Sequence, residues 1–513
     1  MHRLRLPEPY SDTPLAFVDA TAAAPWLARL AAEPATDVLA AMCEQVAAID
    51  AGKLPPPQAI ALLNLLRSAA VPRQAITAAV FTRKALPMQA DEARCFAVTQ
   101  QFWTSLGIAY LRLAPQCTPA NRCLPLHRAA SALRLAEYCH FLAARSCPPL
   151  LAQLQLAVMA GAEANGVLRR PLADPDYPQY GKGSISGQLA WAFLLHASDP
   201  YHLTPAQLQV ADRIFSRWRE LVAFTGQADK SSDAYRLDLA RRFGTDLPAA
   251  IPHHLNGRPV AHKLAQRIQA LQAGESPEAL KLGRTLSASA AIRLLKDIEQ
   301  HLQPPKTTPA GREGAIELVF GGDDAYAILN HKTLNSLDRE GAADRSLSYQ
   351  RMAMFGFDRI SHQPTEVTKK LELASERWLL ADGLVTRPPG NSNALRLAPC
   401  LVAAIVDGKP RLGIMASLQE DSQGGLIAQL AWCRDAVAAG TLKRLAPRGT
   451  HLVRVPAFLL GTGETPSLIV PADAGTRLGV RLELAGLAID SILPTEVIAR
   501  GNDFVHYAST PTG

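Results

Sequence analysis

The sequence predicts a multidomain α+β protein, in which an all-α N-terminal helical array is followed by a C-terminal antiparallel β-barrel region. Three observations predict this class. Helical periodicity dominates as far as His301, and short apolar runs bounded by turns dominate from Val367 onward. Between them lies a stretch rich in Pro and Thr, at 303–312, which is typical of a linker. The chain has 513 residues, enough for several domains with sizeable cores.

The composition is that of a globular protein and excludes several classes of function. Hydrophobic residues make up 48% of the chain and charged residues 19%, which does not fit a disordered protein. The formal net charge of +7 is compatible with an anionic ligand. No run of five or six basic residues is present, so we expect no nucleic-acid partner.

The chain is expected to be cytoplasmic and to need no cofactor. No window approaches the run of about 18 apolar residues that crosses a membrane, so no transmembrane segment is predicted. The first nine residues lack the apolar core of a secretory signal. The eight cysteines are scattered without zinc-ligand spacing and are interpreted as free thiols.

The helical domain is predicted to cover residues 1–302. Its amphipathic segments have apolar residues at three-and-four spacing and are separated by Pro and Gly turns. They are Asp37–Ala48, Gln58–Ser68, Asp91–Arg112, His127–Ser146, Pro148–Asn165, Ser186–Ala197, Thr204–Thr225, Pro259–Ala273, Ser276–Leu282 and Ser287–Leu302. Thr204-Pro205 is a good helix start, because Thr caps and Pro suits the first helical position. No fixed repeat is visible, so the array is either a solenoid or an irregular bundle.

Polar and aromatic residues in this region are better explained by structure than by chemistry. Gly181–Ser184 superficially resembles a phosphate loop, but GxxxxGK[ST] is absent and no strand precedes it. We interpret this segment as a connection between helices. Trp191 and Trp218 lie on apolar helical faces and are expected in the core. His253, His254 and His262 are expected at the surface.

The linker at 303–312 leads into a predicted α/β connecting segment at 313–366. Ala315–Phe320 reads as a strand and Ala325–Leu334 as a helix. The charged stretch Asp338–Asp358 follows. It is either a surface loop or a flexible arm that carries arginines toward an anionic ligand.

The barrel region is predicted at 367–513. Its strand-like runs are short and bounded by turns, the pattern of one or two small closed barrels. They are Val367–Leu373, Arg377–Leu380, Ala394–Leu397, Leu401–Val406, Leu412–Leu418, Leu426–Trp432, Leu452–Leu459, Ser467–Val470, Arg477–Leu484, Ala488–Ala499 and Phe504–Tyr507.

One part of this region resembles the centre of a PilZ domain. Arg377-Trp378 leads to an acidic residue, then to a Gly/Asn/Ser turn and to Ala394–Leu397. The wider chain is similar to proteobacterial PilZ-like proteins that have a long helical N-terminal region. The landmarks of this similarity are Trp26-Leu27, Asp199–Leu203, Arg217-Trp218, Ala273–Pro277 and Gly501–Phe504.

The resemblance implies a receptor for cyclic di-GMP, of a group associated with type IV pili, surface motility or biofilm control. The usual PilZ motifs, RxxxR and [D/N]xSxxG, bring arginines to the phosphates and polar groups to the guanines. The corresponding candidate ligand residues are Arg345, Arg351, Lys369, Lys370, Arg377, Asp382, Asn391, Ser392 and Asn393.

Both motifs are degenerate in this chain. No RxxxR lies in the segment that leads into Trp378, and Leu384–Gly390 reads as an inserted turn between Asp382 and Asn391. Ala394 stands where the motif has Gly, and its methyl group can crowd a base. The alternatives that remain are ligand binding through other residues, or a barrel that has lost its ligand.

These observations predict a cyclic di-GMP-responsive receptor or adaptor that is not an enzyme. The expected partners are a cyclic dinucleotide and a pilus or secretion-machinery protein. The alternative is a nucleotide-independent interaction scaffold with a degenerate PilZ-like barrel. A hydrolase or transferase is disfavoured because HExxH, GxSxG and HD-type spacings are absent. RNA binding is disfavoured because aromatic residues are only 6% of the chain.

Overall fold

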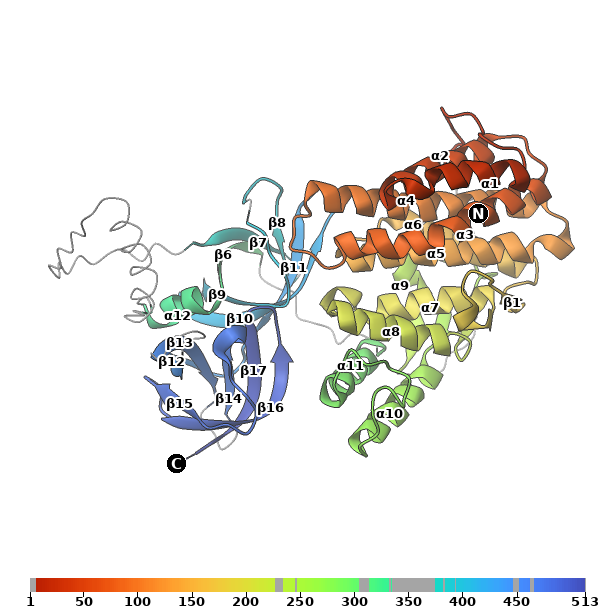
Figure 1. Ribbon diagram of the computed structural model, residues 1–513. Helices are drawn as coiled ribbons and strands as arrows, with labels where there is room; N and C mark the ends of the chain where they lie inside the picture. The colour runs from red at the N-terminus through yellow and green to blue at the C-terminus, as the bar shows by residue number, and fades with distance from the viewer. Residues whose placement is uncertain are drawn as a thin grey trace, which may run out of the picture. The chain divides into compact units, whose positions relative to one another are not determined.

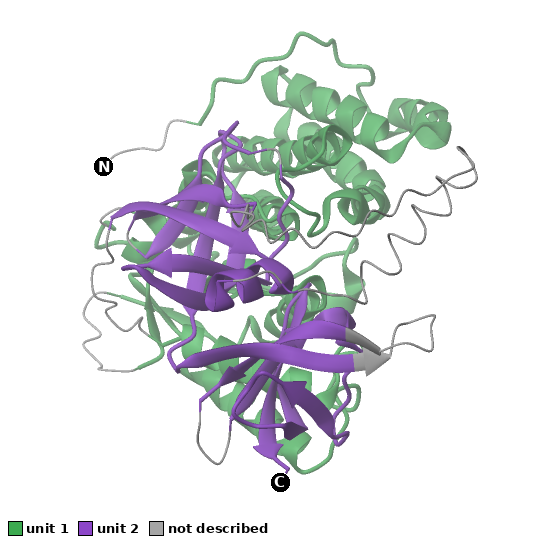
Figure 2. Ribbon diagram, turned by 90° about the vertical axis from the view of Figure 1, so that its left-hand side faces the viewer, with its two compact units in different colours: residues 1–307 green, residues 308–513 purple. Residues whose placement is uncertain are grey.

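The protein divides into two compact units, Met1–Thr307 and Thr308–Gly513 (Figure 2). The computed structural model describes residues 6–226, 234–244, 247–303, 313–331, 334, 374–381, 383–392, 394–445, 452–461 and 466–512. No helix within these ranges is both long and apolar enough to cross a bilayer.

The first unit is built mainly from helices. They are α1 (Ala20–Arg29), α2 (Ala35–Ala51), α3 (Pro56–Phe81), α4 (Ala90–Leu113), α5 (Cys123–Ala143), α6 (Pro149–Ala164), α7 (Ile185–Ala197), α8 (Pro205–Trp218), α9 (Leu239–Phe243), α10 (Arg258–Gln272) and α11 (Ala288–His301). Two small antiparallel sheets lie between them. They contain β1 (Leu172–Ala173) with β2 (Lys182–Gly183), and β3 (Ala223–Thr225), β5 (His254–Asn256) and β4 (Arg236–Asp238).

Helix α5 lies at the centre of this unit and is buried along most of its length. It packs against α4, α6 and α7, and α8 packs in turn against α7 (Figure 1). The core includes Trp103 and Trp191, both almost completely buried. A helix with neighbours on several sides loses its polar face, which explains why charged residues of α5 are buried as well.

Local signals in the sequence set several helix boundaries. Thr204 caps α8, accepting from the backbone N–H of Gln207, while the Gln207 side chain accepts from the backbone N–H of Thr204. Pro205 occupies the first turn, as predicted. Ser184 caps α7 with its side chain alone, its Oγ accepting from the backbone N–H of Gly187 at 2.9 Å.

Two helix boundaries and one predicted helix differ from the prediction. Helix α3 continues through Pro72 to Phe81, because buried Ala70 and Thr77 hold it on both sides of the proline. Helix α8 ends at Trp218, and Ala223–Thr225, which were predicted to belong to it, form β3 instead. The predicted helix Ser276–Leu282 is a series of turns.

The second unit contains a first closed barrel of six antiparallel strands. The strand order is β10-β11-β8-β7-β6-β9. The strands are β6 (Gly314–Phe320), β7 (Glu376–Ala381), β8 (Leu384–Arg387), β9 (Cys400–Val406), β10 (Lys409–Glu420) and β11 (Leu426–Trp432). The segment expected to connect the domains, 313–366, therefore contributes strand β6 to this barrel, between β7 and β9.

A second closed barrel of six antiparallel strands follows, and Figure 2 shows both barrels in purple. Its order is β12-β13-β14-β17-β16-β15. The strands are β12 (Val437–Leu445), β13 (Leu452–Leu460), β14 (Ser467–Pro471), β15 (Leu482–Ala485), β16 (Ser491–Arg500) and β17 (Phe504–Pro511). The predicted fold class, a helical N-terminal region followed by antiparallel barrels, is confirmed.

The two barrels share a hydrophobic core with helix α12 (Gly322–Asn330). Tyr326 and Ile328 of α12 are in a cluster with Leu401 of β9 and Phe458 of β13. Hydrogen bonds complete the junction. Asp503 accepts from the backbone N–H of Leu401 at 3.0 Å.

Several strands were predicted incorrectly. Leu384–Gly390, expected to be an inserted turn, contains β8, which pairs with β7 beginning at Ala381↔Leu384. The positive φ of Gly383, 78°, permits this tight hairpin. The expected strand Ala394–Leu397 forms no strand. The strand β12 was not predicted, and the run Val367–Leu373 lies outside the described residues.

Candidate functional site

Six of the nine predicted ligand residues lie outside the described residues. They are Arg345, Arg351, Lys369, Lys370, Asp382 and Asn393. Three remain: Arg377, Asn391 and Ser392. The structure places these three in and after the β7–β8 hairpin of the first barrel.

Alternation along β7 separates two kinds of side chain. Glu376 and Trp378 are buried inside the barrel, whereas Arg377 between them is exposed. On the outer face Arg377 is directly opposite Glu317 of β6. Arg377 is therefore accessible from solvent, but an acidic residue is its cross-strand neighbour.

The buried carboxylate of Glu376 organises a polar cluster, which we call the Glu376 cluster. It accepts hydrogen bonds from Arg387 Nη1 at 3.0 Å and Arg396 Nη2 at 2.5 Å. The indole N–H of Trp378 and the Oγ of Ser392 each donate to it at 3.3 Å. Burial alone would raise the pKa of Glu376, but the hydrogen bonds and charges of Arg396 and Arg387 lower it.

The arginines of this cluster are held by further contacts. Arg387 donates to the backbone carbonyl of Ala394 at 3.0 Å and is 2% exposed. The Arg396 guanidinium lies over the Phe320 ring, 3.9 Å from its centroid, a cation–π contact. Ser392 also accepts from the N–H of Ala394 at 3.1 Å, while Asn391 is exposed. Ser392 is thus committed to the barrel itself.

Glu376, Arg387 and Arg396 were not among the predicted site residues. The two-residue period would have found two of them, because Glu376 lies two residues before Trp378, and Arg387 two residues after Val385, on the inner face. No pattern in the sequence shows that Arg396 returns to the same carboxylate. The cluster has two arginines for one carboxylate, but each of its side chains is bound to another member, so it is built as a structural element.

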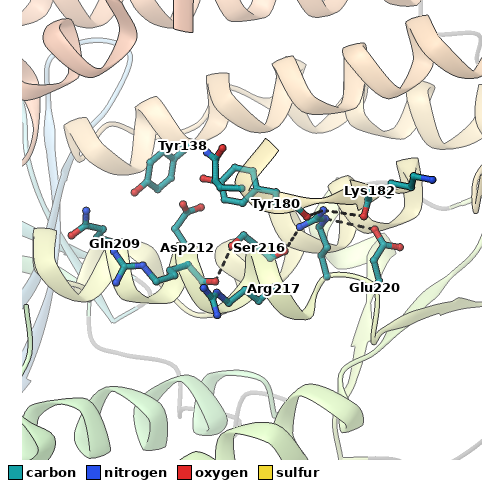
Figure 3. A pocket seen from close by; sticks show the side chains of 11 residues that line it. Tyr138, Tyr180, Lys182, Gln209, Asp212, Ser216, Arg217 and Glu220 are labelled. Atoms are coloured by element: carbon teal, nitrogen blue, oxygen red, sulfur yellow. Dashed lines mark hydrogen bonds and ion pairs between the residues drawn. The ribbon is translucent and has the colours of Figure 1, made fainter. Parts of the chain in front are cut away.

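A second polar site lies within the helical unit, where a cavity of about 550 Å³ is lined by α5, the turn before α7, and α8. Tyr138 and Tyr180 face the side chains of α8 across it (Figure 3). Lys182, Arg213, Arg217 and Arg219 contribute four positive charges to the lining; we call this site the α8 cavity. Its size is within the range of small-molecule sites.

Arg219 connects the segment before α7 to the end of α8 by hydrogen bonds. It is 4% exposed and donates through Nη2 to the carbonyl of Tyr180 at 2.7 Å and that of Lys182 at 3.4 Å. It also donates to the carbonyl of Ser216. A Cβ at Gly183 would lie 2.8 Å from Nη2 of Arg219, so glycine allows this approach. The segment Gly181–Ser184, predicted as a connection between helices, is such a connection and is fastened by Arg219.

Asp212 of α8 is one of the two acidic residues that line the cavity. Its Oδ1 accepts from Trp191 Nε1 at 2.9 Å and lies 4.0 Å from Arg134 Nη1. Arg134 covers the Trp191 ring, 3.5 Å from its centroid. Burial raises the pKa of Asp212 to about 6, and Arg134 only partly opposes this. Trp191 is in the core, as predicted, and also orients a carboxylate.

Of the three predicted surface histidines, His253 is buried, and the structure corrects that expectation. Its Nε2 lies 3.0 Å from the carbonyl of Leu247. Within the ranges that the structure describes, no group of three His, Cys, Asp or Glu residues could hold a metal ion.

Comparison with known families shows which domain the helical unit is similar to. Residues 21–230 match the model described as the N-terminal domain of the cyclic-di-GMP receptor FimW. The helical region is therefore similar to this domain family over the matched residues. The match includes α5, α7 and α8, and hence every residue that lines the α8 cavity.

The match and the two barrels together confirm the resemblance to PilZ-like receptors with a long helical N-terminal region. Comparison with curated proteins gives no match. Comparison with solved structures gives none either.

Proposed function

We propose that this protein is a receptor for cyclic di-GMP. One observation carries the proposal: the helical region matches the N-terminal domain of a receptor for this ligand, and two barrels follow it in the chain. Cyclic di-GMP carries two phosphodiester charges, which suit the net positive charge of the protein.

The process that the receptor regulates is inferred from the same resemblance. The receptor acts in the cytoplasm on type IV pili, surface motility or biofilm formation, through a pilus or secretion-machinery protein. It signals by binding and catalyses no reaction. The candidate ligand residues Arg345, Arg351, Lys369 and Lys370 stay a prediction, because they lie outside the described residues.

Calorimetric titration of the full-length protein with cyclic di-GMP tests this proposal, with GTP as the control ligand. Saturable binding with a Kd below about 10 µM, and at least tenfold weaker binding of GTP, is the expected result. A flat trace at about 1 mM cyclic di-GMP contradicts the proposal, because even binding of about 4 kcal/mol is visible there.

The Glu376 cluster favours a second candidate function, that of a nucleotide-independent scaffold. In this cluster Ser392 and two arginines are bound to one buried carboxylate, so the barrel makes structural use of groups that a ligand would need. A scaffold would retain its partner in a pull-down whether or not cyclic di-GMP is present. Loss or gain of the partner with the nucleotide would favour the receptor.

A further inference from the structure

The exposed positive side chains at the rim of the α8 cavity have no ion-pair partner among the residues that the structure describes. Lys182 and Arg217 are exposed, and their side chains make no hydrogen bond or ion pair with the described residues. Arg213 lies one helical turn before Arg217 and donates to the carbonyl of Leu282 at 3.1 Å. Like charges at this spacing on a helix repel, so their arrangement has a cost that a bound anion would remove.

The two acidic residues of the lining are already committed elsewhere. Glu220 accepts from the backbone N–H of Ser184 at 2.9 Å and from its Oγ at 2.7 Å, at the N-terminus of α7. Asp212 accepts from Trp191. Neither carboxylate forms a short ion pair with Lys182, Arg213 or Arg217 among the described residues.

Arg219, which also lines the cavity, has one N–H donor without a hydrogen bond in the described part of the chain. Arg219 is almost completely buried, yet its Nε makes no hydrogen bond to the described residues and lies 3.6 Å from Glu220 Oε1. A buried donor without a partner is costly. Because the remaining nitrogens of Arg219 hold the carbonyls of Tyr180, Lys182 and Ser216, the guanidinium is fixed before any ligand arrives.

Two tyrosines line the cavity beside these positive charges. Tyr180 stacks with Tyr177, with centroids 5.8 Å apart, and meets the Trp191 ring edge to face at 5.0 Å. It is therefore held in place, and with Tyr138 it lines the cavity opposite α8 (Figure 3). Guanidinium groups for phosphate and rigid rings for a base are the two elements that nucleotide sites combine.

We propose that the α8 cavity binds cyclic di-GMP in the helical unit, with Lys182, Arg213 and Arg217 on a phosphodiester and Tyr180 against a base. This rests on the proposed function for the identity of the ligand, and adds that the helical unit supplies a phosphate site. The carboxylate of Asp212 repels phosphate, so the phosphodiester lies toward Lys182 and Arg217 and the base toward Asp212.

The test is a calorimetric titration of three full-length proteins with cyclic di-GMP. The variant Lys182→Ala/Arg217→Ala removes two exposed side chains of the cavity. The variant Lys53→Ala/Arg29→Ala removes the same two charges from exposed positions that do not line the cavity. We expect at least about tenfold weaker binding by the cavity variant, because charge-assisted hydrogen bonds to phosphate are lost. The control variant is expected to stay within about threefold of wild type.

Hydrogen exchange locates the ligand independently. On saturation of the wild type with cyclic di-GMP, we expect slower exchange in 178–184 and in α8, whose described backbone lines the cavity. Wild-type binding that is unchanged in the cavity variant, with protection only in the barrel unit, overturns this inference and leaves the receptor function intact. No binding to the wild type overturns both.

Discussion

The Glu376 cluster of the barrel and the α8 cavity of the helical unit both gather arginines around carboxylates, but they balance charge in opposite ways. In the barrel, one buried carboxylate accepts from two arginines, a serine and an indole. In the cavity, the carboxylates are turned to Trp191 and Ser184, and the exposed Lys182 and Arg217 are left facing solvent.

The difference indicates where a ligand is needed. Polar groups that are hydrogen-bonded to one another gain little from a ligand. Removing one member of such a cluster leaves the others buried and uncompensated. Exposed cations that line a cavity without a protein partner are hydrogen-bonded to water, and a bound anion replaces that water with charge-assisted hydrogen bonds. The region predicted to be the ligand site, around Ser392, is of the first kind, whereas the helical unit contains the second.

The largest expected effect comes from Glu376→Gln. The substitution leaves Arg387, 2% exposed, and Arg396 without a counter-charge. We expect the free energy of opening β7 and β8 to fall by about 3–5 kcal/mol, measured by native-state hydrogen exchange. Glu317→Gln, on the outer face of the same barrel, is the matched control and is expected to change it by less than about 0.5 kcal/mol.

Acid should have a similar effect on the wild-type barrel. The pKa of Glu376 is lowered in the folded state, so its contribution to stability is present above its ordinary value of 4.5. That contribution is lost as pH falls below 4.5 through the folded pKa. Equal acid sensitivity of wild type and Glu376→Gln would show that Glu376 does not neutralise the arginines.

A smaller effect, of opposite sign, is expected from Asp212→Asn. The pKa of Asp212 is raised to about 6 by burial, so the group stabilises the fold below its ordinary value of 3.8 and this contribution is lost as pH rises through 6. Arg134, Arg213, Trp191, Tyr138 and Tyr180 surround it or contribute to the same lining.

At pH 7.5 the ionised carboxylate is therefore a net cost, and Asn can still accept from Trp191 Nε1. We expect the variant to be more stable by roughly 1–3 kcal/mol at this pH, with no gain at pH 3.5, measured by urea unfolding. Glu33→Gln, an exposed substitution in the same unit, serves as control. A variant that loses stability at pH 7.5 would mean that Arg134 compensates the charge fully.

The smallest effect is expected from Arg377→Ala. Arg377 points outward from β7 and opposes Glu317, so its removal should change stability by less than about 0.5 kcal/mol. If the phosphates bind in the α8 cavity, the affinity for cyclic di-GMP should change by less than about threefold. A tenfold loss of affinity would return the site to the barrel and reverse the comparison.

The sequence by itself determined the features that depend on neighbouring residues. The three-and-four spacing of apolar residues predicted the main helices, and Thr204-Pro205 predicted the start of α8, because a helix end is satisfied by its own capping residues. Short apolar runs between turns predicted most barrel strands. Strands β8 and β12 were not predicted. β8 is only four residues long, and β12 carries Gly440, where a Cβ would lie 2.4 Å from Leu487.

Only the tertiary structure decided which polar groups meet. Arg387 and Arg396 reach Glu376 from 11 and 20 residues away along the chain. The α8 cavity brings together Tyr138, Lys182 and Arg219 from three separate elements. Periodicity reports that a face is buried but not what it is buried against. Packing between distant segments decides whether a charged side chain has an ion-pair partner. It therefore decides whether that side chain stabilises the fold or is left to bind a ligand.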